Sequence, residues 1–263
     1  MGAYIAIFRT ALSEYFVYRL NFILWRVRSV LTLLIRYYLW LAVFEESVLI
    51  FGYTESKMLT YILLSSIISY IVLSTKTADV AGEIVDGKIV NYILKPISFF
   101  KYLVAKDLAD KFLNVAFSIA EIALLIWLLK PPLFIQTDPT MYLFMLYFIV
   151  IGTIISFFIN ISLSFVGFWT PEIWGPRFIF FMLILFFSGT YFPLDILPTP
   201  IYYAMFLTPF PYFFYLPSRI YLGLPQGQLF VFLILGTGWV FISYYATKWL
   251  WHKGMRQFSF FGR

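Results

Sequence analysis

Residues 139–171 read PTMYLFMLYFIVIGTIISFFINISLSFVGFWTP, a run of 33 residues without one charged side chain. A transmembrane α-helix needs about 20 mostly apolar residues, and roughly 17 to 25 is the usual range. The run is therefore longer than one crossing but too short for two crossings with a turn between them. We predict one tilted or overlong transmembrane helix at 141–168, because tilting lets a long apolar helix fit the bilayer.

Working outward from this run, five further segments are long and apolar enough to cross once. The six predicted transmembrane helices cover residues 21–44, 58–75, 112–129, 141–168, 178–194 and 228–247. The first contains Arg26, Arg28 and Arg36 but is otherwise mostly apolar, and the third contains Glu121 as its only charge. We expect an all-α polytopic membrane protein with a single transmembrane domain over residues 1–263.

The composition excludes several other classes of protein. Hydrophobic residues make up 62% of the chain and charged residues only 12%, whereas soluble proteins carry about 25% charged residues. So little charge could not cover the surface of a soluble globule, so lipid must cover most of the chain. The chain has no cysteine and one histidine, His252, which excludes thiolate sites and His-rich metal sites. We expect no catalytic residue and no bound metal.

The proline-rich segment before the last span is predicted to differ from a transmembrane helix. Hydropathy alone would accept a seventh span at 196–218, which carries no charge. Seven of the 13 prolines lie between positions 193 and 225, however. A backbone interrupted so often would leave unpaired amide groups in lipid, whereas short helices dipping into the interface would not. We therefore predict an extracytoplasmic re-entrant segment over 195–227.

The distribution of Lys and Arg predicts the orientation. Six crossings put both termini on one side, and 15 of the 19 Lys and Arg residues belong to that side. Because cytoplasmic loops carry an excess of basic residues, we expect both termini in the cytoplasm and a multi-pass location in the plasma membrane or the bacterial inner membrane. The basic excess then indicates orientation and contact with membrane lipid, and we expect no nucleic-acid partner.

Residues 1–20 are too short and too polar to cross the bilayer, and no cleavage site follows them. Their pattern favours an amphipathic helix along the inner leaflet. Its apolar face consists of Tyr4, Ile5, Phe8, Ala11, Leu12, Tyr15 and Phe16. The alternative is a lead-in to the first span without a role of its own.

One long loop, at 76–111, is predicted on the cytoplasmic side, and it carries six Lys and five acidic residues. Its middle, residues 81–96, reads AGEIVDGKIVNYILKP. Gly87 is suited to end one short helix, and Pro96 is suited to begin the next. Acidic residues beside isoleucines are suited to docking onto a soluble partner, but on this segment alone a solvated loop is the favoured interpretation.

Taken in order, these elements resemble the permeases of the ABC type-2 superfamily, the membrane subunits of ATP-binding cassette exporters, over nearly the full length. The run from Glu83 to Ile89, continuing to Leu94-Lys95-Pro96, resembles the coupling loop of that family. The run Ser188-Gly189-Thr190-Tyr191-Phe192-Pro193, followed by Leu197-Pro198 and residues 209–223, resembles its outer re-entrant signature.

The resemblance implies a function for both motifs. A separate cytoplasmic ATP-binding cassette ATPase would bind the coupling loop and the N-terminal helix, and a second permease subunit would complete the pathway as a homodimer or heterodimer. This chain would bind no cofactor, since ATP and Mg would belong to the ATPase, and Gly87-Lys88 lacks the rest of a phosphate-binding loop. The implied coupling residues are Asp79, Glu83, Asp86, Gly87 and Lys88, and the implied outer gate consists of Ser188, Gly189, Phe192, Pro193 and Pro198.

Other functions stay open from the residues alone. An ion-coupled carrier should show inverted repeats, which the two halves do not display. A non-transport scaffold subunit is the other rival, and a membrane enzyme comes third because the chain has one histidine and no cysteine. The substrate is undetermined, since a hydrophobic compound, a lipid and a polysaccharide all fit the family.

Two intramembrane features are candidate sites. Arg36 and Glu121 are costly to bury, and we favour a structural ion pair between them over contact with substrate. Small and hydroxyl residues recur four residues apart in the fourth span, where they favour helix packing over lining of a conduit. These residues are Gly152, Ser156, Asn160 and Ser164. Aromatic residues at the outer end favour interfacial anchoring, with an exit gate as the alternative.

Overall fold

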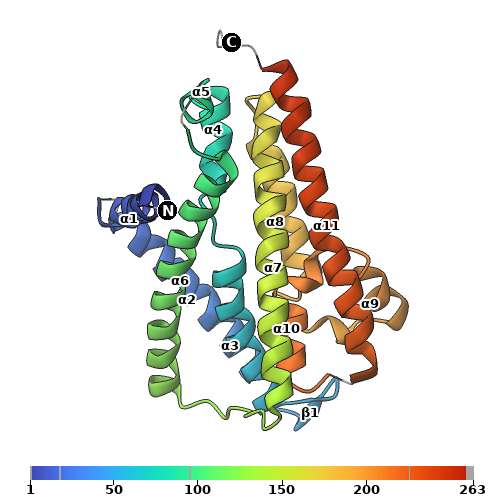
Figure 1. Ribbon diagram of the computed structural model, residues 1–263. Helices are drawn as coiled ribbons and strands as arrows, with labels where there is room; N and C mark the ends of the chain where they lie inside the picture. Colours follow the sequence, from blue (N-terminus) through green and yellow to red (C-terminus); the bar gives the residue numbers. More distant parts are fainter. Residues whose placement is uncertain (1, 18, 95, 225, 259–263) are drawn as a thin grey trace.

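Long helices packed side by side dominate the computed structural model, which describes residues 2–17, 19–94, 96–224 and 226–258 (Figure 1). The longer helices are α1 (Gly2–Val17), α2 (Arg19–Phe44), α3 (Glu55–Val72), α6 (Phe99–Leu129), α7 (Pro139–Phe165), α8 (Trp174–Phe187) and α11 (Gln226–Gln257). The short elements are β1 (Leu49–Ile50), β2 (Tyr53–Thr54), η1 (Thr77–Asp79), α4 (Val80–Val85), α5 (Val90–Ile93), η2 (Val166–Phe168), η3 (Leu194–Ile196), α9 (Thr199–Met205), η4 (Phe210–Tyr212) and α10 (Tyr215–Tyr221).

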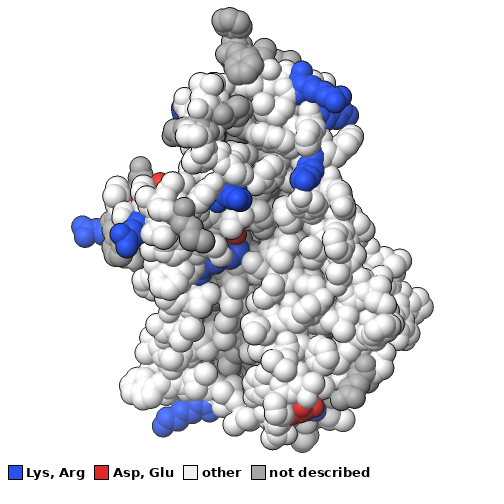
Figure 2. All heavy atoms as spheres, viewed as in Figure 1, with Lys and Arg blue, Asp and Glu red and all other residues white. Residues whose placement is uncertain are grey.

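The bundle has two distinct ends. The short helices α4 and α5 lie at one end, which we call the α4 end, and the strands β1 and β2 lie at the other, which we call the β end (Figure 1). The helix α1 lies across the direction of the long helices and packs on α6, and both α1 and the end of α11 lie toward the α4 end (Figure 1). The face in Figure 2 carries charged side chains near its two ends and beside α1, and a broad uncharged surface lies between the two ends.

The predicted all-α polytopic membrane fold is confirmed. Among the described residues five helices, α2, α3, α6, α7 and α11, are long and apolar enough to span a membrane. The predicted fifth span falls on α8, a shorter apolar helix of 14 residues. At 1.5 Å per residue α8 rises about 21 Å, which is less than the roughly 30 Å of a hydrocarbon core.

The helix that contains the predicted third span begins earlier than that span, and the loop before it is shorter than predicted. The sequence placed the loop at 76–111 and the span at 112–129, but α6 is continuous from Phe99 to Leu129. Charged residues led to that error. Asp107 and Lys111 are four residues apart on one helical face, where they form a buried ion pair of 3.1 Å, and such spacing is compatible with a helix.

The fifth span is displaced relative to the prediction of 178–194. The helix α8 begins at Trp174, because Pro176 is tolerated in a first turn and Arg177 continues the helix. It ends at Phe187, and Gly189 then adopts a left-handed backbone with φ of +76°. Glycine alone takes this conformation without steric cost, so the chain turns here.

The proline-rich segment consists of short helices, as its sequence suggests. Its elements η3, α9, η4 and α10 are three to seven residues long. The helix α10 packs against both α3 and α7, and Tyr212, Phe213 and Tyr215 are fully buried in the larger of two apolar cores. The segment is therefore part of the centre of the bundle at the β end.

The sequence did not predict the β-hairpin between α2 and α3. Leu49 pairs with Thr54, and Ile50 pairs with Tyr53. The two residues of the turn, Phe51 and Gly52, have φ of 51° and 80°. Positive φ at both central residues is typical of a type I′ turn, which suits the twist of a two-residue hairpin.

Candidate functional site

The residues of the implied coupling loop form a small unit, η1–α4–α5, that packs on α7 and η2. The Ser164 hydroxyl on α7 donates to the Thr77 carbonyl at 2.6 Å. The Arg177 guanidinium on α8 donates to that hydroxyl oxygen at 2.7 Å and to the Ala78 carbonyl at 3.4 Å. A side chain on Gly167 of η2 would place its Cβ 3.0 Å from the Ala81 carbonyl oxygen. The unit is therefore bonded to the elbow between α7 and α8.

Apolar side chains also anchor this unit. Val80, Ile84 and Ile89 are buried in the second apolar core, together with Phe165 of α7. Trp251 of α11 stacks on Phe99 at a centroid distance of 5.0 Å beside the same core. Burial of a large apolar side chain is worth about 1.5 to 3 kcal/mol, so the unit is held to three long helices, and the solvated-loop alternative does not describe it.

The charged residues of the unit fall into two groups. Asp86 and Lys88 pair with each other at 2.6 Å, and both side chains are more than half exposed. Gly87 between them has φ of +71° and ends α4 as predicted. Glu83 instead faces inward, where it accepts a hydrogen bond from the Tyr92 hydroxyl at 3.0 Å and lies 4.0 Å from Lys106. The side chain of Asp79 lies outside the described residues.

Tyr92 keeps Glu83 in this inward position. Burial raises the pKa of the Tyr92 hydroxyl above its ordinary value, because a charged phenolate loses more hydration free energy than a neutral phenol when it is removed from water. The hydroxyl therefore stays protonated and donates to the carboxylate. Of the predicted coupling residues, the exposed tip from Asp86 to Lys88 is the part that another protein can reach.

A pocket of 530 Å³ lies beside this tip. Its walls come from α4, from Gly87, from η2 and the turn after it, and from the end of α11, with Val85, Phe168 and Pro171 among the lining residues. Val85 is 37% exposed although its neighbour Ile84 is buried. A pocket with mixed polar and apolar walls beside an exposed charged tip is suited to receive a side chain of a partner protein.

The turn after α8 receives hydrogen bonds from three side chains on neighbouring helices. The carbonyl oxygens of Gly189, Thr190 and Tyr191 accept from the Tyr61 hydroxyl at 2.7 Å, the Arg36 guanidinium at 2.9 Å and the Trp40 indole at 2.8 Å. A Cβ on Gly189 would lie 2.5 Å from the Tyr61 hydroxyl oxygen. This turn is therefore fixed between α2 and α3, and it contains the predicted gate residues Ser188 and Gly189.

The other predicted gate residues lie close by. Pro193 is buried, Phe192 is partly buried and packs against the larger core, and Pro198 is exposed at the start of α9. The sequence analysis missed Asp195. Its carboxylate accepts from the Tyr53 hydroxyl at 2.8 Å and from Arg219 at 2.8 Å, which joins β2, η3 and α10. The run Asp195 to Arg219 carries no other charge, which could have suggested the pair.

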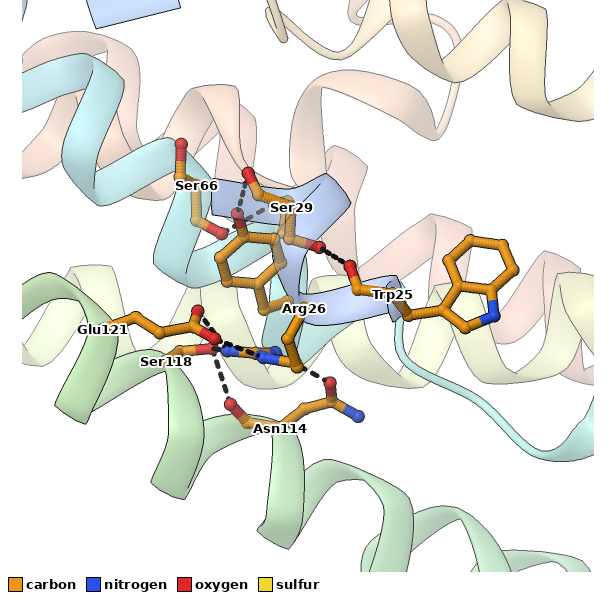
Figure 3. A network of polar contacts seen from close by, with 9 residues as sticks. Trp25, Arg26, Ser29, Ser66, Asn114, Ser118 and Glu121 are labelled. Carbon is orange, nitrogen blue, oxygen red and sulfur yellow. Dashed lines mark hydrogen bonds and ion pairs between the residues drawn. The ribbon is translucent and has the colours of Figure 1, made fainter. Parts of the chain in front are cut away.

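The expected ion pair between Arg36 and Glu121 is wrong. Glu121 pairs with Arg26, whose Nε donates to Glu121 Oε1 at 2.6 Å, and Asn114 and Ser118 accept further bonds from the same guanidinium at 3.1 Å. Figure 3 shows Arg26 extending from α2 towards these α6 side chains, whereas Trp25 points away. The bounds of α2 alone do not indicate which of its arginines faces Glu121 on α6.

The face of small residues on α7 is buried within the chain. A Cβ on Gly152 would lie 2.5 Å from the Tyr212 carbonyl oxygen, so the glycine lets the proline-rich segment approach the α7 backbone. The Asn160 amide donates to the Ser156 carbonyl at 2.9 Å, and Ser164 bonds to η1 as described. Gly152 and Ser164 therefore contact other parts of the same chain, and Ser156 and Asn160 are bonded to each other.

Comparison with known families agrees with this architecture. The model of the family described as ABC-2 family transporter protein matches residues 30–262. The chain belongs to the ABC-2 transporter family. No curated protein matches the chain.

Membership defines the general role of the chain. It is a permease subunit of an ABC transporter, a multi-pass membrane component without an ATPase motif of its own, and such a permease works with an ATP-binding cassette ATPase. The matched region contains the η1–α4–α5 unit, the turn at 188–191 and the proline-rich segment, so these three parts lie within the family domain, whereas Arg26 precedes it.

Proposed function

We propose that this ABC-2 permease is the membrane-spanning subunit of an ATP-driven exporter and forms the translocation pathway as a dimer with a second permease subunit. A separate ATPase binds at the α4 end and drives the transport cycle. ATP and Mg are bound by that ATPase, and this chain binds no cofactor. The observation that carries the proposal is the bonding of the exposed tip Asp86–Lys88, through α4 and η1, to the elbow between α7 and α8.

This bonding gives a route for mechanical coupling. A partner that displaces the tip also displaces Thr77 and Ala78, whose carbonyls are bonded to Ser164 and Arg177. Arg177 belongs to α8, and the turn after α8 is bonded to α2 and α3. Movement at the α4 end is therefore transmitted to the segment at the β end by a continuous series of packed and hydrogen-bonded groups.

The orientation proposed for the chain places the α4 end in the cytoplasm. The basic excess of the loops at that end supports it. Because the chain has no native cysteine, the labelling of a single introduced cysteine shows directly on which side of the membrane that residue lies. Lys88→Cys should react with an impermeant maleimide only after the membrane is opened, whereas Glu45→Cys at the β end should react in intact cells. The reverse pattern would refute the orientation.

Binding of the ATPase is tested by charge reversal at the tip. ATP-binding cassette ATPases from the same organism are co-expressed with the tagged permease, and the one that co-purifies with the wild-type chain is the probe. Asp86→Lys should weaken association roughly tenfold, which corresponds to about 1.4 kcal/mol, and should lower ATPase stimulation by the permease. Glu45→Lys, an exposed acid at the β end, is the matched control. Unchanged association of the Asp86→Lys variant would contradict the proposed contact.

A further inference from the structure

An apolar groove of 510 Å³ runs along α2 and α6 beside the end of α1. Four of the α2 residues that line it are spaced by four positions, namely Arg19, Ile23, Val27 and Leu31. They form a stripe over about 18 Å of the helix, since each residue rises 1.5 Å. Ile23, Val27 and Leu31 are each at least half exposed, so the groove is open to the surroundings of the bundle.

The floor of the groove offers no free charge. Arg26 and Glu121 line it, but they pair with each other, and Asn114 and Ser118 accept the remaining bonds of the guanidinium. The Arg26 guanidinium also lies 6.0 Å from the centre of the Phe117 ring. A buried arginine with its donors satisfied in this way does not need a ligand, so an occupant of the floor must be apolar.

The end of the groove toward α1 carries a positive charge that pairs with no described carboxylate, in contrast to the floor. Arg19 is exposed at the beginning of α2, and it forms no ion pair with a described carboxylate. An amphipathic occupant would place an apolar chain against Val27 and Leu31 and an anionic head beside Arg19. This combination of apolar floor and cationic mouth is complementary to an anionic lipid.

We infer that the groove is a binding site for one acyl chain of an anionic phospholipid from the leaflet at the α4 end, with the lipid phosphate beside Arg19. The chain lies along the stripe of α2 and against Leu113 and Phe117 of α6. Tyr15 of α1 lines the same groove, and its hydroxyl donates to Asp110 of α6, so a bound lipid also contacts the junction of three helices. The inference does not depend on the ATPase.

The experiment uses the full-length chain purified in detergent and stripped of lipid. Phosphatidylglycerol and phosphatidylcholine with identical acyl chains are offered in turn, and bound lipid is counted by native mass spectrometry. The wild type should retain phosphatidylglycerol about fivefold better, since one Lys or Arg beside anionic lipid is worth about 1 kcal/mol. Arg19→Gln should abolish this preference, because it lowers the retention of anionic phosphatidylglycerol more than that of phosphatidylcholine, whose choline offsets the charge of the phosphate.

Filling the groove tests the position of the acyl chain. Val27→Trp should reduce the retention of both lipids, and Leu31→Trp provides a second obstruction if the first variant fails to fold. The matched controls are Arg9→Gln, an exposed arginine of α1, and Leu39→Trp, a 55% exposed position of α2 outside the groove. Both controls should behave as the wild type.

Three outcomes would overturn the inference. The first is a preference for phosphatidylglycerol that survives Arg19→Gln. The second is unchanged lipid retention in both tryptophan variants. The third is a loss of self-association in Val27→Trp, which would show that a second copy of the chain covers the groove. Failure of the ATPase test above would leave this lipid measurement unaffected, so the two proposals are distinguished.

Discussion

The guanidinium of Arg36 on α2 donates to the backbone carbonyl of Thr190, 2.9 Å away and 154 residues later in the chain. Arg36 is 6% exposed, and its other terminal nitrogen donates to the Ser66 hydroxyl at 2.9 Å. A buried cation normally pairs with a carboxylate, yet here the partners are the carbonyl that follows α8 and a hydroxyl. Cations are favourable at the carboxyl ends of helices because the last carbonyls lack partners. Arg36 therefore fixes the end of α8 to the first span.

Replacing Arg36 should weaken this attachment strongly. We expect Arg36→Met to lower the free energy of unfolding by about 3 kcal/mol, because it leaves the Thr190 carbonyl buried without a donor and removes a charge-assisted bond. Thermal unfolding of the detergent-solubilised chain measures the loss. Arg28→Met is the control, since Arg28 is exposed and stacks on Trp25. Equal losses in the two variants would contradict the role of Arg36.

The Arg26–Glu121 pair should show the signature of a buried ion pair. Breaking such a pair costs about 3 to 5 kcal/mol, because the remaining charge is left unpaired, whereas removing both partners costs much less. We therefore expect Arg26→Met and Glu121→Leu to unfold at clearly lower temperatures than the double variant. Thermal melts of all four chains form a double-mutant cycle. Additive losses would show that the two residues do not interact.

Local sequence determines the parts of this fold that could be predicted. The α7 helix begins where Asp138 accepts a hydrogen bond from the Thr140 amide at 2.8 Å, with Pro139 in the first turn. It ends at Phe165 and is followed directly by η2, within the uncharged run 139–171, so this helix could be predicted from neighbouring residues alone. The same holds for Gly87, whose positive φ was suggested by its place between two short apolar segments.

Features that depend on helix crossings could not be predicted. Which arginine of α2 faces Glu121 follows from where α2 begins and how it crosses α6, and neither is encoded near Glu121. The start of α6 was missed because Asp107 and Lys111 are paired inside the protein, where sequence hydropathy counts them as solvated. The partners of residues 189–191 are more than 100 residues away. The groups that accept these bonds are backbone carbonyls, which every residue has, so the residue types do not indicate which carbonyls are bonded.

Two glycines with positive φ allow backbone strain to be separated from crowding at the turn after α8. Gly189 has φ of +76°, and its Cβ would lie 2.5 Å from the Tyr61 hydroxyl oxygen, whereas Gly223 has φ of +97° with nothing within 4 Å of its Cβ. Both alanine variants should lose about 1 to 2 kcal/mol from the left-handed conformation. Gly189→Ala should lose a further 1 to 3 kcal/mol from overpacking. Equal decreases in unfolding temperature for the two alanine variants would mean that the turn after α8 can shift to accommodate the added methyl group.

The bond from Ser164 to Thr77 should control how firmly the η1–α4 unit is attached. Ser164→Ala removes the donor to the Thr77 carbonyl and the acceptor for Arg177. Since a hydrogen bond to a charged group is worth about 1.5 to 3 kcal/mol, local opening of residues 77–85 should become at least tenfold more frequent. Hydrogen exchange measured by mass spectrometry detects this directly. Ser162→Ala is the control, because the Ser162 hydroxyl bonds to Thr247 of α11 instead. If exchange at 77–85 is equally slow in both variants, apolar packing alone attaches the unit, and the proposed route from the tip to α8 loses its hydrogen-bonded step.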